Sequence, residues 1–260
     1  MVPVLLLTVA ACQRRSLDEE TVTMAFSVEM GAMASDDSGT KADIDASAVT
    51  QLLIGLFDTA GNPLRAISVE RELDEDFTFS LALAEGMYYH LVLFAQKTDQ
   101  YQDVSTYNSA ELLECIHLDN VKTLNVEDTD AFSYSGEIVA SERSQSITMA
   151  RIFARLCVAT KTPADNNVDM TMTVAELPTQ FNAKTGVFSG TVSSMEFTGK
   201  SKTGETIATE YHSLAYAYVP VADLVTVTVN FERGGETVVS GTVDNVPLQR
   251  NYRTNILGDF

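Results

Sequence analysis

The chain has 260 residues, of which 45% are hydrophobic, so it can bury one large core or two smaller ones. Seventeen Lys and Arg residues stand against 36 Asp and Glu residues, which gives a formal net charge of −19. A surface this acidic repels phosphate backbones, and the sequence has no Lys/Arg-rich patch to offset the repulsion. Nucleic acid is therefore excluded as an expected partner.

The first residues predict export and a lipid anchor. Residues 2–11 are an apolar run that ends in small residues directly before Cys12. The run is shorter than the ~18–20 residues that span a bilayer, but it suits the hydrophobic part of a secretory signal. A cysteine in this position resembles a bacterial lipobox, although Val9 replaces the commoner leucine and no basic segment precedes Val2. We expect residues 1–20 to be a lipoprotein signal and tether, with lipid (palmitate) on Cys12.

An ordinary buried first strand with an incidental cysteine is the alternative, and the very polar residues 13–20 argue against it. The clearest strand follows at Thr21–Met30, where apolar and polar side chains alternate. A period of two predicts a strand with one buried face and one solvated face. The side chains on the apolar face are Val22, Met24, Phe26, Val28 and Met30.

The rest of the first half alternates between short strands and turns. Residues 31–47 are rich in Asp, Ser, Gly and Ala without periodicity, which predicts a loop. Residues 58–63 (DTAGNP) have the composition of a hairpin turn. Residues 98–130 are mostly polar and irregular, with one or two helical turns expected at 110–116. The strands that we expect in this half are residues 49–57, 64–70, 77–83 and 87–95.

The second half continues the same pattern, and it has no long amphipathic helix. The strands that we expect there are residues 147–160, 168–175, 187–197, 206–211, 214–219, 224–231, 237–243 and 251–257. Short strands at intervals near ten residues indicate β-sandwiches. We therefore predict an all-β protein with little helix, built of two tandem transthyretin-like or immunoglobulin-like sandwiches. The N-terminal sandwich should span residues 21–145 and the C-terminal one residues 146–260.

The sequence nominates no catalytic, cofactor or metal site. Cys115 and Cys157 lie in dissimilar contexts, and we expect both to be free thiols. Residues 165–169 (DNNVD) offer oxygen ligands, but they lack the Gly and distal Glu of a calcium loop. The three histidines do not have the spacing of metal ligands; they are His90, His117 and His212. We therefore expect a protein that binds and assembles, with no cofactor and no enzymatic activity.

Four strings, in this order, resemble the fimbrillin family of Bacteroidales-type pili. They are residues 86–96 (GMYYHLVLFAQ), 130–132 (DAF), 151–156 (RIFARL) and 246–258 (VPLQRNYRTNILG). The last is the most specific, and together with the lipobox the match covers nearly the whole chain. The resemblance implies two transthyretin-like sandwiches, lipid anchoring at the cell outer membrane, and assembly into surface fimbriae with other fimbrial subunits.

The resemblance also implies a mode of assembly. In this family a protease removes the first strand, and the groove that remains accepts a strand from a neighbouring subunit, which is donor-strand pairing. Thr21–Met30 matches the removed strand. Two features of the chain depart from the stalk subunits of this family. Residues 31–47 contain Lys41 but no Arg, whereas stalk subunits are cut after Arg. The chain also stops at Asp259 and Phe260. Either the sequence is clipped at both ends, or the protein is an anchor or accessory subunit that keeps its lipid and donates no strand, which is the interpretation we favour.

A surface lipoprotein that binds host glycan or peptide through its sandwich loops is the alternative function. That function predicts an aromatic cluster on a concave surface. The candidate side chains are Tyr88, Tyr89, Tyr101 and Tyr107. Tyr88 and Tyr89 are neighbours on one strand, so only one of them can point into the core. Whether Thr21–Met30 completes a sheet as a removable edge strand should separate the two functions.

Overall fold

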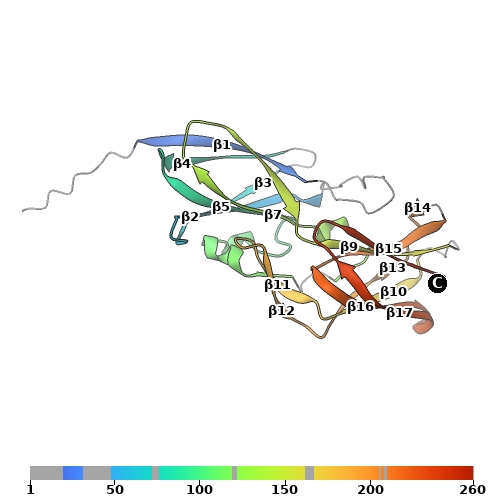
Figure 1. Cartoon of the computed structure of the whole chain (residues 1–260). Coiled ribbons are helices and arrows are strands. Elements are labelled where there is room, and N and C mark those ends of the chain that lie inside the picture. Colours follow the sequence, from blue (N-terminus) through green and yellow to red (C-terminus); the bar gives the residue numbers. More distant parts are fainter. Residues whose placement is uncertain are drawn as a thin grey trace, which may run out of the picture.

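The computed structural model describes residues 20–31, 48–71, 76–118, 122–161, 167–204, 206–207 and 210–259. Of these, 64% lie in strands and 6% in helical turns, which confirms the predicted all-β class. Cys12, Lys41 and Phe260 lie outside the described residues. The two halves of the chain follow one another along an elongated body (Figure 1).

The first half is a seven-stranded sheet folded into two layers. Its strands are β1 (Thr21–Met30), β2 (Gln51–Phe57), β3 (Pro63–Glu70), β4 (Phe77–Ala84), β5 (Tyr88–Gln96), β7 (Phe132–Val139) and β8 (Gln145–Arg151). They run in the order β3-β2-β5-β7-β8-β1-β4. β7 and β8 share only two residue pairs, Phe132↔Arg151 and Ser133↔Ala150, so the sheet bends there. The two layers enclose a first core, to which β1, β2, β4 and β5 all contribute buried side chains.

The segment between β5 and β7 covers the outer face of β2 and β5. It contains short 3₁₀ turns, η2 (Val104–Thr106), η3 (Ala110–Glu114) and η4 (Glu127–Thr129), and the two-residue strand β6 (Ile116–His117). η3 falls where the sequence predicted helical turns. Side chains from this segment form an outer cluster with Phe57, Phe94 and Phe153. β2 is consequently buried on both faces, which is why all seven of its residues are shielded from solvent.

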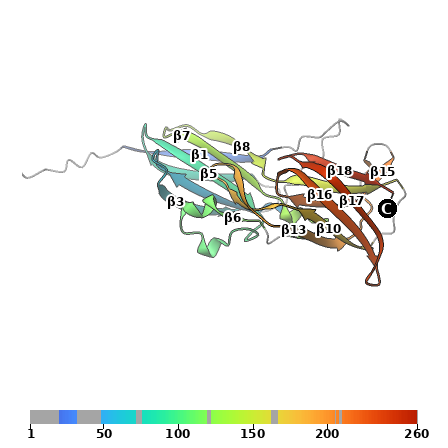
Figure 2. The ribbon, with the colours of Figure 1, turned by 60° about the horizontal axis from the view of Figure 1, so that its bottom comes forward.

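The second half is built from β9 (Ala154–Thr160), β10 (Asp169–Ala175), β11 (Pro178–Asn182), β12 (Val187–Thr191), β13 (Ser194–Lys200), β14 (Thr206–Ile207), β15 (Tyr211–Val219), β16 (Ala222–Arg233), β17 (Glu236–Leu248) and β18 (Arg253–Gly258). Two four-stranded sheets, β13-β10-β16-β17 and β14-β15-β9-β18, enclose a second core. The long β16–β17 hairpin extends from this sandwich (Figure 2).

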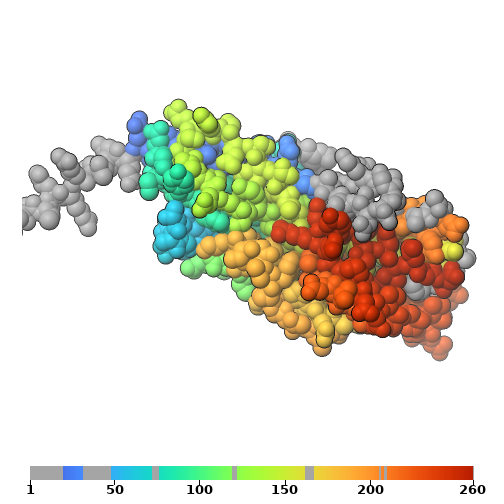
Figure 3. Space-filling view, in the orientation of Figure 1, coloured from blue at the N-terminus to red at the C-terminus, as the bar shows by residue number. Residues whose placement is uncertain are grey.

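A small third sheet connects the two halves. Its order is β12-β11-β6, and it brings Phe181 of β11 into the outer cluster against the first half. In the space-filling view the orange β11–β12 segment lies against the cyan and green surface of the first half (Figure 3). The Nζ atom of Lys184, in the β11–β12 turn, donates a hydrogen bond of 3.1 Å to the carbonyl of Gly61. The two halves therefore share a packed interface.

The predicted strand at 147–160 is two strands, β8 and β9, which belong to different sheets. Ile152 and Phe153 separate them, and both side chains are fully buried in the outer cluster. Two consecutive buried side chains break the alternation of a half-buried strand, so the chain turns there. Because β8 pairs within the first sheet, we propose that the sandwiches divide between Arg151 and Ala154, and not at residue 145.

Other predicted bounds also needed correction. The expected strand at 187–197 is β12 and β13, with a break between them, and β7 and β11 were missed. β7 carries two serines and a glycine, and β11 begins with Pro178, so neither shows the β-branched, alternating pattern of a strand.

Candidate functional site

β1 points its apolar side chains into the first core. Val22, Met24, Phe26 and Val28 are each at most 5% exposed, and Met30 packs at the rim of the same core. These are the residues that the sequence analysis named as candidates for strand exchange. The opposite face of the strand is almost entirely exposed, because its Thr, Ala and Glu side chains point to solvent.

β1 lies inside its sheet, between β4 and β8. It pairs antiparallel with β4 from Thr21↔Ala84 to Val28↔Phe77, and parallel with β8 from Phe26↔Gln145 to Met30↔Met149. The strand therefore completes its sheet as an interior strand, not as an edge strand. Its removal would leave a slot with β4 on one side and β8 on the other, and the hydrogen-bonding groups of both would face that slot.

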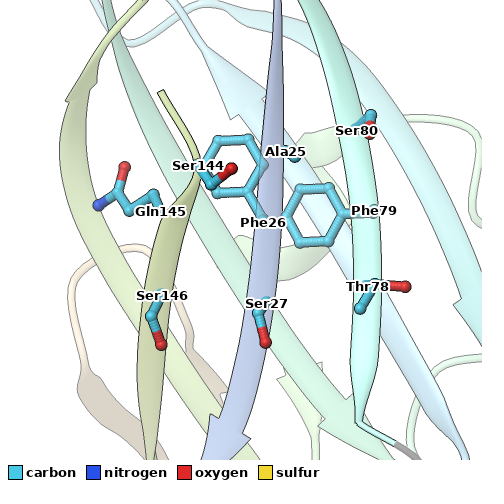
Figure 4. Close-up of a pocket in the computed structure, with 9 residues that line it drawn as sticks. All are labelled: Ala25, Phe26, Ser27, Thr78, Phe79, Ser80, Ser144, Gln145 and Ser146. Carbon is cyan, nitrogen blue, oxygen red and sulfur yellow. The ribbon is translucent and has the colours of Figure 1, made fainter. Parts of the chain in front are cut away.

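A groove lies beside the part of β1 where pairing with β8 begins. It has a volume of about 600 Å³ and draws its lining from β1, β4 and the start of β8. Figure 4 shows Phe26 of β1 beside Phe79 of β4, and their rings stack with centroids 4.7 Å apart. The N-terminal half of β1 pairs with β4 alone, since the β8 ladder starts only at Phe26. The other lining residues are Ala25, Ser27, Thr78, Ser80, Ser144, Gln145 and Ser146.

The burial of β1 is a large part of the stability of the first sandwich. Burying one Val, Met or Phe side chain contributes ~1.5–3 kcal/mol, so the four buried side chains contribute about 6–12 kcal/mol together. A whole domain is typically stable by about 5–15 kcal/mol. A first sandwich without a strand in this position would therefore be only marginally stable.

The strings that resemble fimbrillin meet at the junction of the two halves. Asp130 accepts hydrogen bonds of 2.9 and 2.7 Å from Nε of Arg151, and both side chains are 1% exposed. Arg250 donates from Nε to the carbonyl of Arg151 at 3.0 Å and from Nη2 to Oγ of Ser133 at 2.6 Å. The backbone N–H of Asn251 donates to the carbonyl of Phe153 at 2.9 Å. Residues far apart in the sequence thus join β7, β8 and β9.

Burial dominates the electrostatics at this junction. It raises the pKa of Asp130 to about 7, against the opposing effect of the Arg151 guanidinium. The hydroxyl of Tyr218 donates to the carboxylate of Glu127, and burial raises the pKa of Tyr218 well above its ordinary value. The guanidinium of Arg155 lies 4.1 Å from the ring centre of Tyr216. This polar network holds the two halves together, and nothing in its arrangement suggests a reaction.

The four tyrosines proposed as a ligand-binding cluster do not gather. Tyr88 is 58% exposed, and Tyr89 packs against the first core while its hydroxyl accepts a bond of 3.2 Å from the N–H of Ala84. Tyr101 and Tyr107 are buried in the outer cluster. The prediction of an aromatic cluster was wrong, because residues 101–107 pack against β2 and β5 in a segment whose sequence has no strand period.

The remaining candidates have ordinary roles. Cys115 and Cys157 form no disulfide with one another, as expected, and Cys157 is buried. Nε2 of His90 lies 2.7 Å from Oγ of Ser135. Across the described residues, no three His, Cys, Asp or Glu side chains are grouped to hold a metal ion. No helical turn in that part of the chain is long and apolar enough to cross a membrane.

Several solved structures share this fold at low sequence identity. A "putative cell adhesion protein" from Bacteroides ovatus aligns with a TM-score of 0.53 and 13% identity, over 92% of this chain and 93% of that one. The tip fimbrial protein Mfa3 from Porphyromonas gingivalis aligns with a TM-score of 0.50 and 12% identity, over 87% and 82%. "Putative polysaccharide binding proteins" from Bacteroides thetaiotaomicron align with a TM-score of 0.51 and 11% identity, over 84% and 79%.

The chain is thus a two-part all-β protein with the fold of bacterial adhesin and fimbrial proteins. No curated protein matches it. The model of the Family of unknown function (DUF6562) matches residues 15–260, and the chain belongs to that family. The resemblance to fimbrillins is supported at the level of the fold.

Proposed function

We propose that this protein is a structural or adhesive subunit of cell-surface fimbriae, and that it assembles by β-strand addition. The observation that carries the proposal is the burial of β1 between two strands: it is not the edge strand that was expected, but an interior strand whose removal would leave a slot. This strand fills the first core with four buried side chains and pairs with a strand on each side. The fold shared with a tip fimbrial protein and with proteins named for cell adhesion supports the cell-surface role.

In this proposal, subunits assemble through the slot that removal of β1 would leave between β4 and β8. A cut within residues 32–47 would leave β1 attached by hydrogen bonds and packing alone. A partner strand that alternates apolar side chains in the same way could then replace it. The incoming strand would pair with β4 and β8 and refill the positions of Val22, Met24, Phe26 and Val28. Burial of the four apolar side chains, about 6–12 kcal/mol, holds whichever strand occupies the slot, and the difference between the two strands in pairing and burial drives the replacement.

The groove at Phe26 offers a place for exchange to begin. β1 is held on one side only along its N-terminal half, so this half can separate from β4 first and give a partner strand access to the slot. A stepwise replacement never exposes the whole apolar slot to water. The other subunits of the fimbria are the partners in this proposal, through donor-strand pairing.

Lipid on Cys12 would place the protein at the cell outer membrane. Each buried CH₂ contributes ~0.8 kcal/mol, so more than one acyl chain gives stable anchoring. Lipid anchoring suits an anchor or accessory subunit that stays at the base of a fimbria. In this function the protein acts by binding and assembly, with no catalysis.

Strand exchange can be tested with the protein's own strand. A specific protease site is inserted within residues 32–47, the protein is cut, and an isotopically labelled peptide of residues 20–31 is added. Native mass spectrometry should show the labelled peptide replacing β1. A matched peptide with Phe26→Asp should not enter, because it would bury a charge without a partner. Entry of both peptides to the same extent, or of neither while β1 dissociates, would refute strand addition.

A further inference from the structure

A second cavity lies between the two halves of the protein, next to the C-terminal end of β1, where Glu29 pairs with Thr148 of β8. Its volume is about 410 Å³, within the range of small-molecule sites. We call it the junction pocket, and define it by residues from β7, β8, the β11–β12 turn and the stretch after β17. The side chains that matter are Ser133, Tyr134, Thr148, Lys184, Thr185 and Arg250. No acidic residue lines this pocket, although the chain holds 36 of them.

The charge of Arg250 is not balanced by the protein. Its Nε and Nη2 atoms donate to the carbonyl of Arg151 and the hydroxyl of Ser133, and neither group is negatively charged. Within the described residues Nη1 has no hydrogen-bond partner. Burial lowers the pKa of Arg250, and no carboxylate opposes that effect. A half-buried guanidinium without a counter-charge is costly, and a bound anion would remove the cost.

The other cation of the pocket is already paired. Nζ of Lys184 donates to the carboxylate of Glu114 at 2.6 Å and to the carbonyl of Gly61 at 3.1 Å. The buried guanidinium of Arg151 is likewise matched by Asp130. Arg250 is therefore the source of uncompensated positive charge, and its free Nη1 edge is suited to a carboxylate oxygen.

Hydroxyl groups surround this charge. Oγ of Ser133 accepts from Arg250, so its own proton remains available to a ligand. The hydroxyls of Thr148, Thr185 and Tyr134 make no hydrogen bonds within the part of the chain that the structure describes. One guanidinium and several hydroxyls match a ligand that carries one carboxylate and several hydroxyl groups.

We propose that the junction pocket binds a hydroxyl-rich carboxylate, which is the chemistry of an acidic sugar. The carboxylate contacts the free edge of the Arg250 guanidinium, and the sugar hydroxyls contact Ser133, Thr148 and Thr185. Both halves of the chain contribute residues to this site, so a bound ligand also stabilises the contact between them. The proposal does not depend on strand exchange at β1.

Isothermal titration calorimetry on the full chain tests the site, with sodium glucuronate as the probe and ionic strength held constant with sodium chloride. Glucose supplies the hydroxyls without the charge, and acetate supplies the charge without the hydroxyls. Glucuronate should bind at least about tenfold more tightly than either, the size of one charge-assisted hydrogen bond. No detectable binding of glucuronate, or an affinity for glucuronate no higher than that for acetate or for glucose, would overturn the proposal.

An introduced carboxylate can block the pocket while Arg250 keeps its hydrogen bonds to Arg151 and Ser133. Thr148→Asp places a carboxylate at the pocket from an exposed position on β8 and should weaken glucuronate binding by about tenfold or more. Thr237→Asp is the matched control, an identical change at an exposed position of β17, and should bind as the wild type does. The melting temperatures of both variants show that they are folded. Unchanged glucuronate binding by a folded Thr148→Asp variant would place the ligand elsewhere and refute the assignment.

Discussion

Truncation of Phe26 is the sharpest test of how β1 stabilises the first sandwich. Phe26 is 2% exposed, belongs to the first core and stacks on Phe79 with an angle of 10° between the rings. Phe26→Ala would remove the ring from this core and leave a cavity. Such truncations cost about 3–5 kcal/mol, a value that includes the lost transfer free energy and the cavity. The stack with Phe79 places the expected loss at the upper part of that range.

Urea unfolding followed by far-ultraviolet circular dichroism measures this loss. The transition of the first sandwich should move to lower urea, while that of the second core, which shares no side chain with β1, stays in place. Thr23→Ala is the matched control on the exposed face of the same strand and should change the free energy of unfolding by less than about 0.5 kcal/mol. A Phe26→Ala variant destabilised by less than about 1 kcal/mol would show that β1 is not an integral part of the core.

Three further predictions concern the anchor and the junction. Cys12→Ser should move the protein from the membrane fraction to the soluble fraction on cell fractionation, and recovery of this variant with the membranes would contradict lipidation. Arg151→Met should destabilise the protein by about 3–5 kcal/mol in urea unfolding, because it leaves Asp130 buried without its counter-charge. Lys200→Met at an exposed ion pair should cost under about 1 kcal/mol. Because the pKa of Asp130 is raised from 3.8 to about 7 on folding, its contribution to stability should be fully present below about pH 4 and be lost as the pH rises to about 7. An Asp130→Asn variant whose stability falls just as steeply over this range would contradict that assignment.

Local pattern determined much of the first half. A period of two in Thr21–Met30 was sufficient to define both the strand and its buried face, because successive side chains of a strand point to opposite sides. The turn at residues 58–63 was equally readable, since Asp58 caps it through its carboxylate and Gly61 takes a positive φ of 89°. The prediction of a lipobox at Cys12 and the order of the fimbrillin-like strings likewise depend on the sequence alone.

Pairing between distant segments could not be read from local pattern. The sequence does not show that β1 lies between β4 and β8, because β8 comes more than a hundred residues after β1. The same holds for the division that we propose after Arg151, which depends on the burial of Ile152 and Phe153 in the outer cluster. A run of apolar residues has the same period whether it continues one strand or crosses between two sheets.

The junction pocket shows most clearly which features of the protein cannot be predicted from its sequence. The sequence contains Arg250 within a recognisable string, but a sequence cannot show whether an arginine has a counter-charge. Only the tertiary structure brings this residue beside Ser133, 117 positions earlier in the chain, in a pocket whose lining contains no acidic residue. The alternation of side chains along a strand is visible in neighbouring residues, whereas the charge balance of a pocket depends on contacts that form when distant strands pack together.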